Sequence, residues 1–507
     1  MEYDAIIIGA GHNGLISAAY LAQAGYRVAV FERRDIVGGA VSTKELVPGY
    51  QIDLGGSAHI LIRQTPVVEE LELEQYGLRY LELDPMFVAP FPDGETVFIY
   101  RDLARTVNHL ESLFPGEGEA YHQFVTDWQG FARTMRDVFL AAPTPFEIGK
   151  RMIAGASSPL PWKQELRHIL QPYENVVKSY FNEEKLQTLI AWMAAQSGPP
   201  PTEPLTGPFA LWHALYHDGG VARPEGGSGM LTQALKHHIE SHGGDIFTEA
   251  PVQEILVQNG RARGVRVEGD VYTSRIVCSA THAQQTFRHL LPEKYRPEGT
   301  SGLRIGNGFG AMLRLALDEP VEYTAHPGSD ARVGLQLLCR DLTQLRGAYG
   351  EYLGNQPSTD PPLVAMTFSA VDETLAPPGG EVLWLWGQYF PYELANGQSW
   401  DQIADKVADR LIDQFETYAP GIREHIVGQL FQHPAWLERH LGLYRGNVMH
   451  LEMSIDQMFA ARPTLGLSSY RGPVDDLYLT GASTHPGGGI MGASGRNAAR
   501  TMLKDLA

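Results

Sequence analysis

Three glycines near the start of the chain stand at the spacing Gly-x-Gly-x-x-Gly. Gly9, Gly11 and Gly14 follow an apolar run, and an Ala- and Leu-rich segment ending at Gly25 comes after them. In a strand-turn-helix, the first glycine permits a tight turn, the second lets the backbone approach a pyrophosphate, and the third lets the helix pack closely on the strand. The helix N-terminus then offers free N–H groups to the phosphates. The pattern predicts dinucleotide binding, with Asn13 in the same turn.

A carboxylate ends the next apolar run. Residues 27–31 are expected to form a second strand, and Glu32 follows it, 18 residues after Gly14. A carboxylate at this place accepts hydrogen bonds from ribose hydroxyl groups. The strand, helix, second strand and acid together predict one β-α-β unit.

Two further glycine pairs indicate which dinucleotide binds. Gly38-Gly39 comes soon after Glu32, and Gly55-Gly56 follows. A nicotinamide dinucleotide seldom needs three glycine positions where the backbone can approach the ligand closely. An extended FAD does need them, because the backbone must approach its pyrophosphate, its ribityl chain and its ring. We therefore predict FAD, and the alternative is that both pairs are ordinary turns. The predicted site also includes Arg33, Ala40 and Ser57.

A glycine-rich stretch at the far end of the chain repeats the order strand, loop and helix. Gly481 and Ala482 are expected to lie alongside the ribityl and pyrophosphate groups of FAD, and Gly489 and Met491 belong to the same loop. Gly492, at the start of the helix, would present N–H groups to the flavin carbonyl that becomes negative on reduction. The cofactor would therefore be bound by both ends of the sequence.

Composition excludes several classes of protein. At 507 residues the chain should form about two to four domains. A net charge of -19 argues against nucleic acid as a partner and against electrostatic adhesion to anionic lipid. Cys278 and Cys339 lie in apolar stretches and are expected to be buried thiols in a reducing compartment. The first strand leaves no room for a signal peptide, and no apolar run is long enough to cross a bilayer, so a cytoplasmic location is expected.

The middle of the chain alternates between sheet and helix patterns. Residues 78–83 and 96–100 are expected to be strands of a second sheet, residues 102–195 are helical, and apolar strands recur at 311–317, 363–368 and 382–386. The strand beginning near Val252 could offer its main chain to an adenine edge, or Val252 could be a plain sheet residue. The apolar strands at 311–317, 363–368 and 382–386 could line an apolar cavity, or they could simply form a well-packed sheet.

These patterns predict an α/β fold, α+β overall. A Rossmann-like FAD-binding domain is assembled from separated segments, beside a mixed-sheet substrate domain and a helical subdomain that could contact a membrane. The expected segments are 1–72, 216–295 and 451–507 for FAD binding, 73–101 and 296–450 for the substrate domain, and 102–215 for the helices. Within the helical part, the apolar residues of 131–160 could form a buried helix pair, or they could form a surface that inserts into one face of a membrane.

Both glycine motifs, residues 9–14 with Glu32 and Gly38-Gly39 and residues 479–489, resemble those of the FAD-dependent phytoene-desaturase-like oxidoreductases. Within them the chain is most similar to the flavoprotein β-carotene ketolases of cyanobacteria and deinococci, through residues 55–62, 192–201 and 446–454. The similarity covers essentially the whole chain. One departure is Ala40, where many relatives carry Arg near the pyrophosphate; Arg33 and Arg34 are nearby cations.

The resemblance implies a long apolar carotenoid substrate and a peripheral position at a membrane. A hydride would leave an allylic carbon for the flavin, because the conjugated chain spreads the positive charge. Ketone formation at ring position 4 would then require an oxygen nucleophile and a second two-electron oxidation. The alternatives are a carotenoid desaturase or isomerase, an amine oxidase and, from another class, a GDI-like lipid-escort protein without chemistry.

Catalytic side chains are not assigned. His59 and His485 lie in glycine-flanked loops expected near the flavin, where either could take a proton or merely stabilise its loop. Arg314, on an apolar strand, is expected to be a paired structural residue. The spacing of the remaining histidines predicts no metal site, and the sequence does not indicate an oligomeric state.

Overall fold

A seven-stranded sheet carries the predicted β-α-β unit. The computed structural model describes residues 2–155, 160–298 and 300–507. The strand order is β10-β11-β12-β1-β2-β9, with β18 beside β12, and β1 runs parallel to β2 and β12. The strands are β1 (Glu2–Ile8), β2 (Val28–Phe31), β9 (Asp245–Phe247), β10 (Val252–Gln258), β11 (Arg261–Val267), β12 (Asp270–Ser279) and β18 (Leu477–Leu479). The predicted α/β fold is confirmed.

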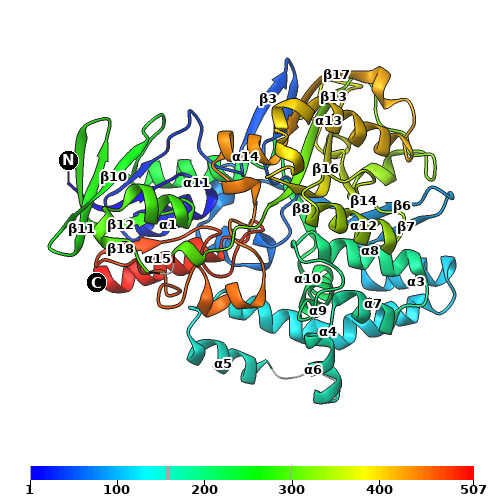
Figure 1. Cartoon of the computed structure of the whole chain (residues 1–507), viewed down its shortest axis with the longest axis horizontal. Helices are drawn as coiled ribbons and strands as arrows, with labels where there is room; N and C mark the ends of the chain where they lie inside the picture. Colours follow the sequence, from blue (N-terminus) through cyan, green and yellow to red (C-terminus); the bar gives the residue numbers. More distant parts are fainter. Residues whose placement is uncertain (1, 156–159, 299) are drawn as a thin grey trace.

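Three helices from distant parts of the chain pack together beside this sheet. They are α1 (His12–Gln23), α11 (Met230–Ser241) and α15 (Ala493–Leu506), and α1 contacts both of the others. Figure 1 shows α15 lying beside α1, although the two helices come from opposite ends of the sequence. The predicted C-terminal strand, loop and helix are therefore brought onto the N-terminal unit.

A second seven-stranded sheet lies at the other end of the molecule (Figure 1). Its order is β17-β13-β16-β15-β14-β6-β7. One face packs under helix α13 (Trp400–Glu416), and the other faces the helical region, so both faces are covered. The strands are β6 (Phe87–Pro90), β7 (Thr96–Ile99), β13 (Gly308–Leu317), β14 (Leu335–Leu338), β15 (Leu363–Met366), β16 (Glu381–Pro391) and β17 (Ile426–Gln432).

One predicted strand belongs elsewhere. The run at 78–83 forms β5 (Tyr80–Leu83), which pairs with β8 (Val221–Pro224) in a separate two-stranded sheet, so its assignment to the second large sheet was wrong. The alternation of residues predicts a strand but does not choose its partner, and β8 comes from far along the chain. A hairpin of β3 (Thr43–Val47) and β4 (Tyr50–Asp53) forms the fourth sheet.

Helices make up the remaining region, at the lower right of Figure 1. Side chains cap the N-termini of several helices: Asp102 accepts from Arg105 N at the start of α3 (Leu103–Leu113), and Thr144 accepts from Glu147 N at the start of α5 (Pro145–Ala154). No helix among the described residues is both long and apolar enough to cross a membrane. The helices are α3 (Leu103–Leu113), α4 (Glu117–Phe139), α5 (Pro145–Ala154), α6 (Trp162–Leu170), α7 (Tyr173–Tyr180), α8 (Glu184–Ala195), α9 (Gly207–Leu211) and α10 (Tyr216–Gly219), with α2 (Val67–Glu70), α12 (Leu342–Leu353) and α14 (Pro434–Leu441) elsewhere.

Helix α5 is not part of the core. None of its residues is buried, and its apolar side chains Phe146 and Ile153 are 75% and 80% exposed. A buried helix pair, one of the two predictions for 131–160, is therefore wrong for α5, while residues 156–159 lie outside the described residues. Elsewhere, Cys278 and Cys339 are buried free thiols, as predicted.

Candidate FAD site and the polar cluster beside it

The first glycine turn has the geometry that nucleotide binding requires. Gly9 has a φ of 96°, in the left-handed region that favours glycine. A Cβ on Gly14 would lie 2.3 Å from the Gly9 carbonyl oxygen and 2.8 Å from the Ala280 side chain, so only glycine lets α1 approach so closely. A Cβ on Gly11 would meet nothing within 4 Å, so the backbone here borders open space.

Glu32 lies beside this turn. Its carboxylate accepts hydrogen bonds from Ala10 N at 2.9 Å and Arg34 N at 3.0 Å, and the side chain is 6% exposed. Arg34 also donates to the Gly39 carbonyl oxygen at 2.8 Å, whereas Arg33 is exposed. The acid therefore ties β2 to the glycine turn, at the place expected for ribose recognition.

The later glycine pairs fold back onto the same turn. Gly38 N donates to the Ala10 carbonyl oxygen at 2.7 Å, and a Cβ on Gly39 would lie 3.2 Å from Gly11 Cα. Gly56 N donates to the Ala40 carbonyl oxygen at 3.0 Å. Three segments that are separate in sequence are thus joined by backbone contacts, which places Ser57 in the same region.

The C-terminal loop meets the N-terminal unit at the helix starts. Asn13 Oδ1 accepts from Gly495 N at 3.1 Å, so α1 and α15 begin side by side. Gly492, the N-cap of α15, has a φ of 74°, and the Met491 carbonyl oxygen accepts from the Thr65 hydroxyl at 3.2 Å.

The structure also places the other predicted C-terminal residues in this region. Gly481 lies beside Ala280, which directly follows β12. Gly489 lies beside Leu61, and the Ala482 carbonyl oxygen accepts from Arg462. Val252 begins β10, two residues after Ala250 N donates to the Glu32 carbonyl oxygen. The structure thus brings the predicted residues together, and their individual contacts with the cofactor stay predictions.

The two histidines considered as proton acceptors are buried. His59 shares hydrogen bonds with the Tyr80 hydroxyl at 2.9 Å and the Ser228 hydroxyl at 2.8 Å, which occupies both ring nitrogens. Burial, with a smaller effect of Arg223, lowers its pKa to about 3. His485 Nε2 lies 3.2 Å from the Val138 carbonyl oxygen, and burial lowers its pKa to about 4. These contacts hold each ring in its loop as a neutral imidazole.

Lowering the pH from about 7.5 to about 5 should destabilise the protein in part through His59. Its pKa is about 3 in the folded protein against an ordinary 6.5, so the unfolded chain binds more protons below pH 6.5. Its contribution to stability is therefore complete above that pH and is lost as the pH falls toward 3. His59→Gln should reduce the loss over this range by about 2 kcal/mol, measured by urea unfolding at each pH. Parallel pH profiles for the two proteins would contradict this.

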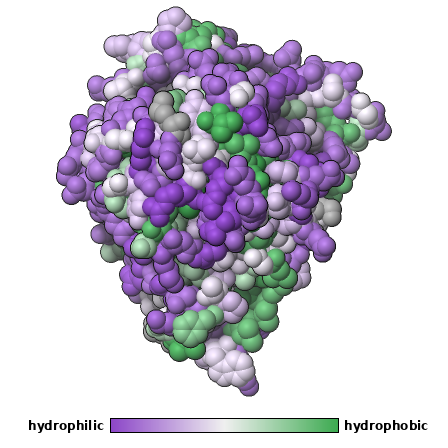
Figure 2. Space-filling model, turned by 90° about the vertical axis from the view of Figure 1, so that its left-hand side faces the viewer, coloured by the Kyte–Doolittle hydropathy of each residue, from purple (hydrophilic) through white to green (hydrophobic). Residues whose placement is uncertain are grey.

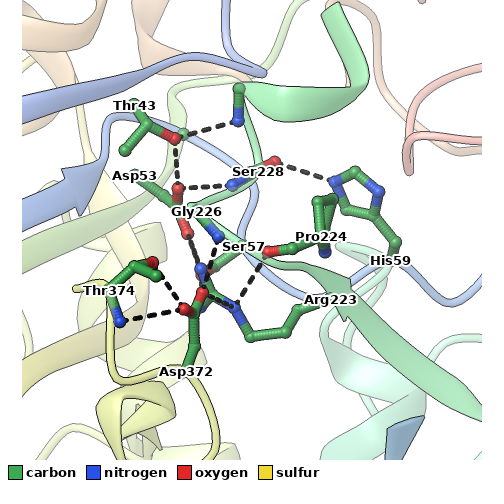
Figure 3. A network of polar contacts seen from close by, with 12 residues as sticks. Thr43, Asp53, Ser57, His59, Arg223, Pro224, Gly226, Ser228, Asp372 and Thr374 are labelled. Carbon is green, nitrogen blue, oxygen red and sulfur yellow. Dashed lines mark hydrogen bonds and ion pairs between the residues drawn. The ribbon is translucent and has the colours of Figure 1, made fainter. Parts of the chain in front are cut away.

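A buried polar cluster adjoins the Gly55-Gly56 pair, and Figure 3 shows its side chains. Arg223, 1% exposed, lies between Asp53 and Asp372, with Nη2 3.6 Å from Asp53 Oδ2 and Nε 3.4 Å from Asp372 Oδ2. Asp53 accepts from Thr43, Ser57 and Ser228 N, and Asp372 accepts from Gly226 N and Thr374. The cluster joins the β3-β4 hairpin, β8 and the segment after β15.

Sequence reasoning missed this cluster. The available signals were Asp53, which directly precedes Leu54-Gly55-Gly56, and Arg223, which stands between two glycine pairs. Neither residue type identifies its partner, because the three charged residues are far apart along the chain.

Arg314 differs from its prediction as a paired residue. Within the described part of the chain, no carboxylate is at ion-pairing distance from it. Its guanidinium donates to Gln432 Oε1 at 2.8 Å and the Gly55 carbonyl oxygen at 3.0 Å, and it stacks 3.9 Å from the centre of the Trp384 ring. Burial lowers its pKa to about 9, against the raising effect of Asp53. Because β13 places Arg314 on the face toward the glycine loops, this cation connects the second sheet with Gly55.

A small cavity lies between these groups. Its volume is about 20 Å³, enough for one water-sized group. Polar side chains and apolar residues of strands β15 and β16 both line it. The lining includes Asp53, Ser57, Arg223, Arg314, Phe368 and Trp384.

Comparisons with known proteins agree with this architecture. The profile of the flavin containing amine oxidoreductases matches residues 14–304. The chain is 32% identical over 547 aligned residues to pyridine nucleotide-disulfide oxidoreductase domain-containing protein 2 of Rattus norvegicus, covering 100% of this chain and 94% of that protein. It is 26% identical over 524 residues to the phytoene desaturase (lycopene-forming) of Pseudescherichia vulneris, covering 99% of each.

A solved structure shares the fold. An oxidoreductase from Methanosarcina mazei superposes with a TM-score of 0.63 at 20% identity, over 99% of this chain and 100% of that one. The two helix N-termini, the glycine turn open at Gly11 and the acid at the end of β2 define an FAD-binding oxidoreductase. The chain belongs to the flavin containing amine oxidoreductase family. Its cofactor is FAD, as predicted, and the residues around the glycine turn fit that group.

Proposed function

We propose that this protein is an FAD-dependent carotenoid oxidoreductase, and that its reaction is the 4-ketolation of β-carotene to echinenone and canthaxanthin. The observation that carries the proposal is the apolar face of β15 and β16 opposite the Gly55-Gly56 loop, with Met366, Phe368 and Val382 beside the small cavity. Such a wall suits a hydrocarbon chain better than a charged amine. A relative named for phytoene desaturation supports the same substrate class.

The side chains at this site suit a reaction that needs alignment more than acid or base catalysis. Bound FAD supplies a two-electron oxidant that accepts a hydride. His59 is neutral, and two hydroxyl groups occupy both of its ring nitrogens, so it is not free to relay protons. His485 Nε2 donates to the Val138 carbonyl oxygen, while its Nδ1 has no partner among the described residues. The apolar wall would exclude water and hold the ring against the glycine loops.

A carotenoid desaturase or isomerase is the second candidate. It is favoured by the names of two relatives, the lycopene-forming phytoene desaturase and a 4,4'-diapophytoene desaturase of Staphylococcus haemolyticus, 27% identical over 527 residues. A desaturase would lose a proton after hydride transfer, where a ketolase captures oxygen. The two reactions would use the same FAD loops and the same apolar wall.

Pigment analysis distinguishes these reactions. The chain should be expressed in a bacterium that accumulates β-carotene. The pigments should then be separated by chromatography and identified by mass spectrometry. Echinenone or canthaxanthin, in which one oxygen replaces two hydrogens on a ring, is the expected product. Unchanged β-carotene beside yellow, FAD-loaded protein would contradict ketolation, and conversion of phytoene in a parallel strain would then support the desaturase.

We also propose that the protein docks peripherally on a membrane through α5 and α6. Phe146, Ile153 and Trp162 are 75%, 80% and 68% exposed, and Leu166 and Leu170 are nearly half exposed. Figure 2 shows apolar residues gathered at the lower end of the molecule, where these helices lie in Figure 1. An apolar patch of this kind is unusual on a free surface, and a lipid-soluble substrate would have to arrive from a bilayer.

Removing two exposed apolar side chains should release the protein from membranes. Phe146→Ser with Ile153→Ser should reduce the fraction that sediments with liposomes at least about tenfold, because each buried side chain contributes about 1.5–3 kcal/mol. The matched control is Leu353→Ser, on α12, where the leucine is 65% exposed but lies outside the patch. Equal sedimentation of the double variant and the control would contradict docking through α5.

A further inference from the structure

Two residues that line the small cavity each carry a buried hydrogen-bond donor with no acceptor among the described residues. Arg223 Nη2 and Trp384 Nε1 are both without a hydrogen-bond partner, although the residues are only 1% and 6% exposed. Arg223 Nη2 lies 3.6 Å from Asp53 Oδ2, which is within ion-pairing distance but beyond a hydrogen bond. A buried donor without an acceptor costs about 1–3 kcal/mol, so two at one cavity call for a ligand atom.

The charges around the cavity indicate what that atom is. Asp53 and Asp372 supply two negative charges, and Arg223 and Arg314 supply two positive ones, so the surrounding side chains are already balanced. A carboxylate ligand would leave a buried net negative charge, whereas a neutral oxygen would accept hydrogen bonds without adding charge. The volume of about 20 Å³ admits one such oxygen.

The position of the cavity connects it with the reaction. Ser57 and Asp53 flank the Gly55-Gly56 pair predicted to approach FAD, and the Arg314 guanidinium donates to the Gly55 carbonyl oxygen. The lining also includes the apolar side chains of Met366, Phe368 and Val382. Hydrogen-bond donors and hydrocarbon side chains therefore line the same cavity, which admits one oxygen atom.

We propose that this cavity binds a neutral hydroxyl or carbonyl oxygen on the end group of an otherwise apolar substrate, with Arg223 Nη2 and Trp384 Nε1 as donors. The proposal rests on the proposed function and deepens it. Ketone formation oxidises the same ring carbon twice, so the oxygen gained in the first oxidation must stay at the site for the second. An oxygen held by these donors keeps the partly oxidised ring in place, and a water molecule fills the cavity when no substrate is bound.

Binding of a matched pair of pigments tests the proposal. Echinenone and β-carotene, which differ by one ring ketone, should be offered separately in the same detergent micelles to FAD-loaded protein, and the bound pigment extracted and quantified. The protein should bind echinenone about tenfold more tightly than β-carotene, because the ketone satisfies the two donors. Trp384→Phe removes one donor but keeps an aromatic ring, and should weaken echinenone binding about five- to tenfold more than it weakens β-carotene binding.

The control variant is Trp386→Phe. Trp386 neighbours Trp384 along β16, with ring centres 6.0 Å apart, but it does not line the cavity. This variant should leave the binding of both pigments unchanged. Equal binding of the two pigments by the unmodified protein, or an equal effect of Trp384→Phe on both, would overturn the proposal.

Failure of the carotenoid assignment gives a different result. If neither pigment binds, the proposed substrate class is wrong, and the same comparison is made with carvone and limonene, a small cyclic ketone and its parent hydrocarbon. Preference for carvone that is lost in Trp384→Phe supports the oxygen site for another apolar substrate. Equal binding of this pair, or no binding of either, overturns it.

Discussion

Replacing Arg223 by Met should lower the free energy of unfolding by about 3–5 kcal/mol, because Asp53 and Asp372 would be left buried without a cation. The aliphatic part of Met preserves most of the volume beside Phe368, over whose ring the guanidinium lies at 5.0 Å. The loss should therefore report charge more than packing. Urea unfolding monitored by circular dichroism measures it.

Two further variants separate the electrostatic effect from other causes. Adding Asp372→Asn to Arg223→Met should recover part of the lost stability, since one of the unpaired carboxylates is then neutral. Arg471→Met breaks an ion pair with Asp505 whose side chains are 49% and 29% exposed, and should cost no more than about 1 kcal/mol. A similar small loss for Arg223→Met would show that the buried cluster does not stabilise the fold.

Replacing Gly11 by Ala should leave folding intact but weaken FAD binding about 10- to 100-fold. The new methyl group meets no protein atom within 4 Å, and Gly11 has an ordinary φ of -65°, so the protein itself has no reason to resist the change. The methyl would instead enter the space where the backbone must approach the pyrophosphate, and such overpacking costs about 1–3 kcal/mol. The measurements are FAD titration by flavin fluorescence and thermal unfolding without added FAD.

Neighbouring glycines provide the controls. Gly14→Ala places a methyl 2.3 Å from the Gly9 carbonyl oxygen, so it should lower both stability and FAD content. Gly347 lies within α12, and a Cβ there would also meet no protein atom within 4 Å. Gly347→Ala should therefore weaken neither FAD binding nor the stability of the fold. Full FAD affinity in Gly11→Ala would mean that the cofactor does not pass this backbone, and the assignment of the glycine turn would fail.

The sequence by itself was sufficient for the cofactor and the nucleotide-binding unit. Gly9, Gly11 and Gly14 with Glu32 act over a short stretch, and each glycine is required by local backbone geometry that leaves a recognisable spacing. The C-terminal loop ending at Gly492 is equally local, since a strand, a turn and a helix N-terminus follow each other directly. Such features can be predicted because the interactions that require them lie mostly between neighbours in the chain.

Only the tertiary structure decided what surrounds the proposed reaction. Arg223 forms ion pairs with Asp53 and Asp372. Arg314 donates to Gly55 and Gln432 and stacks on Trp384. None of these partners is near its arginine in the sequence. The apolar pattern of α5 is the same for a helix in a core and for one on a surface; its exposure depends on what the rest of the chain leaves uncovered. Charge pairing and burial depend on through-space neighbours, which strand and helix periodicity does not specify.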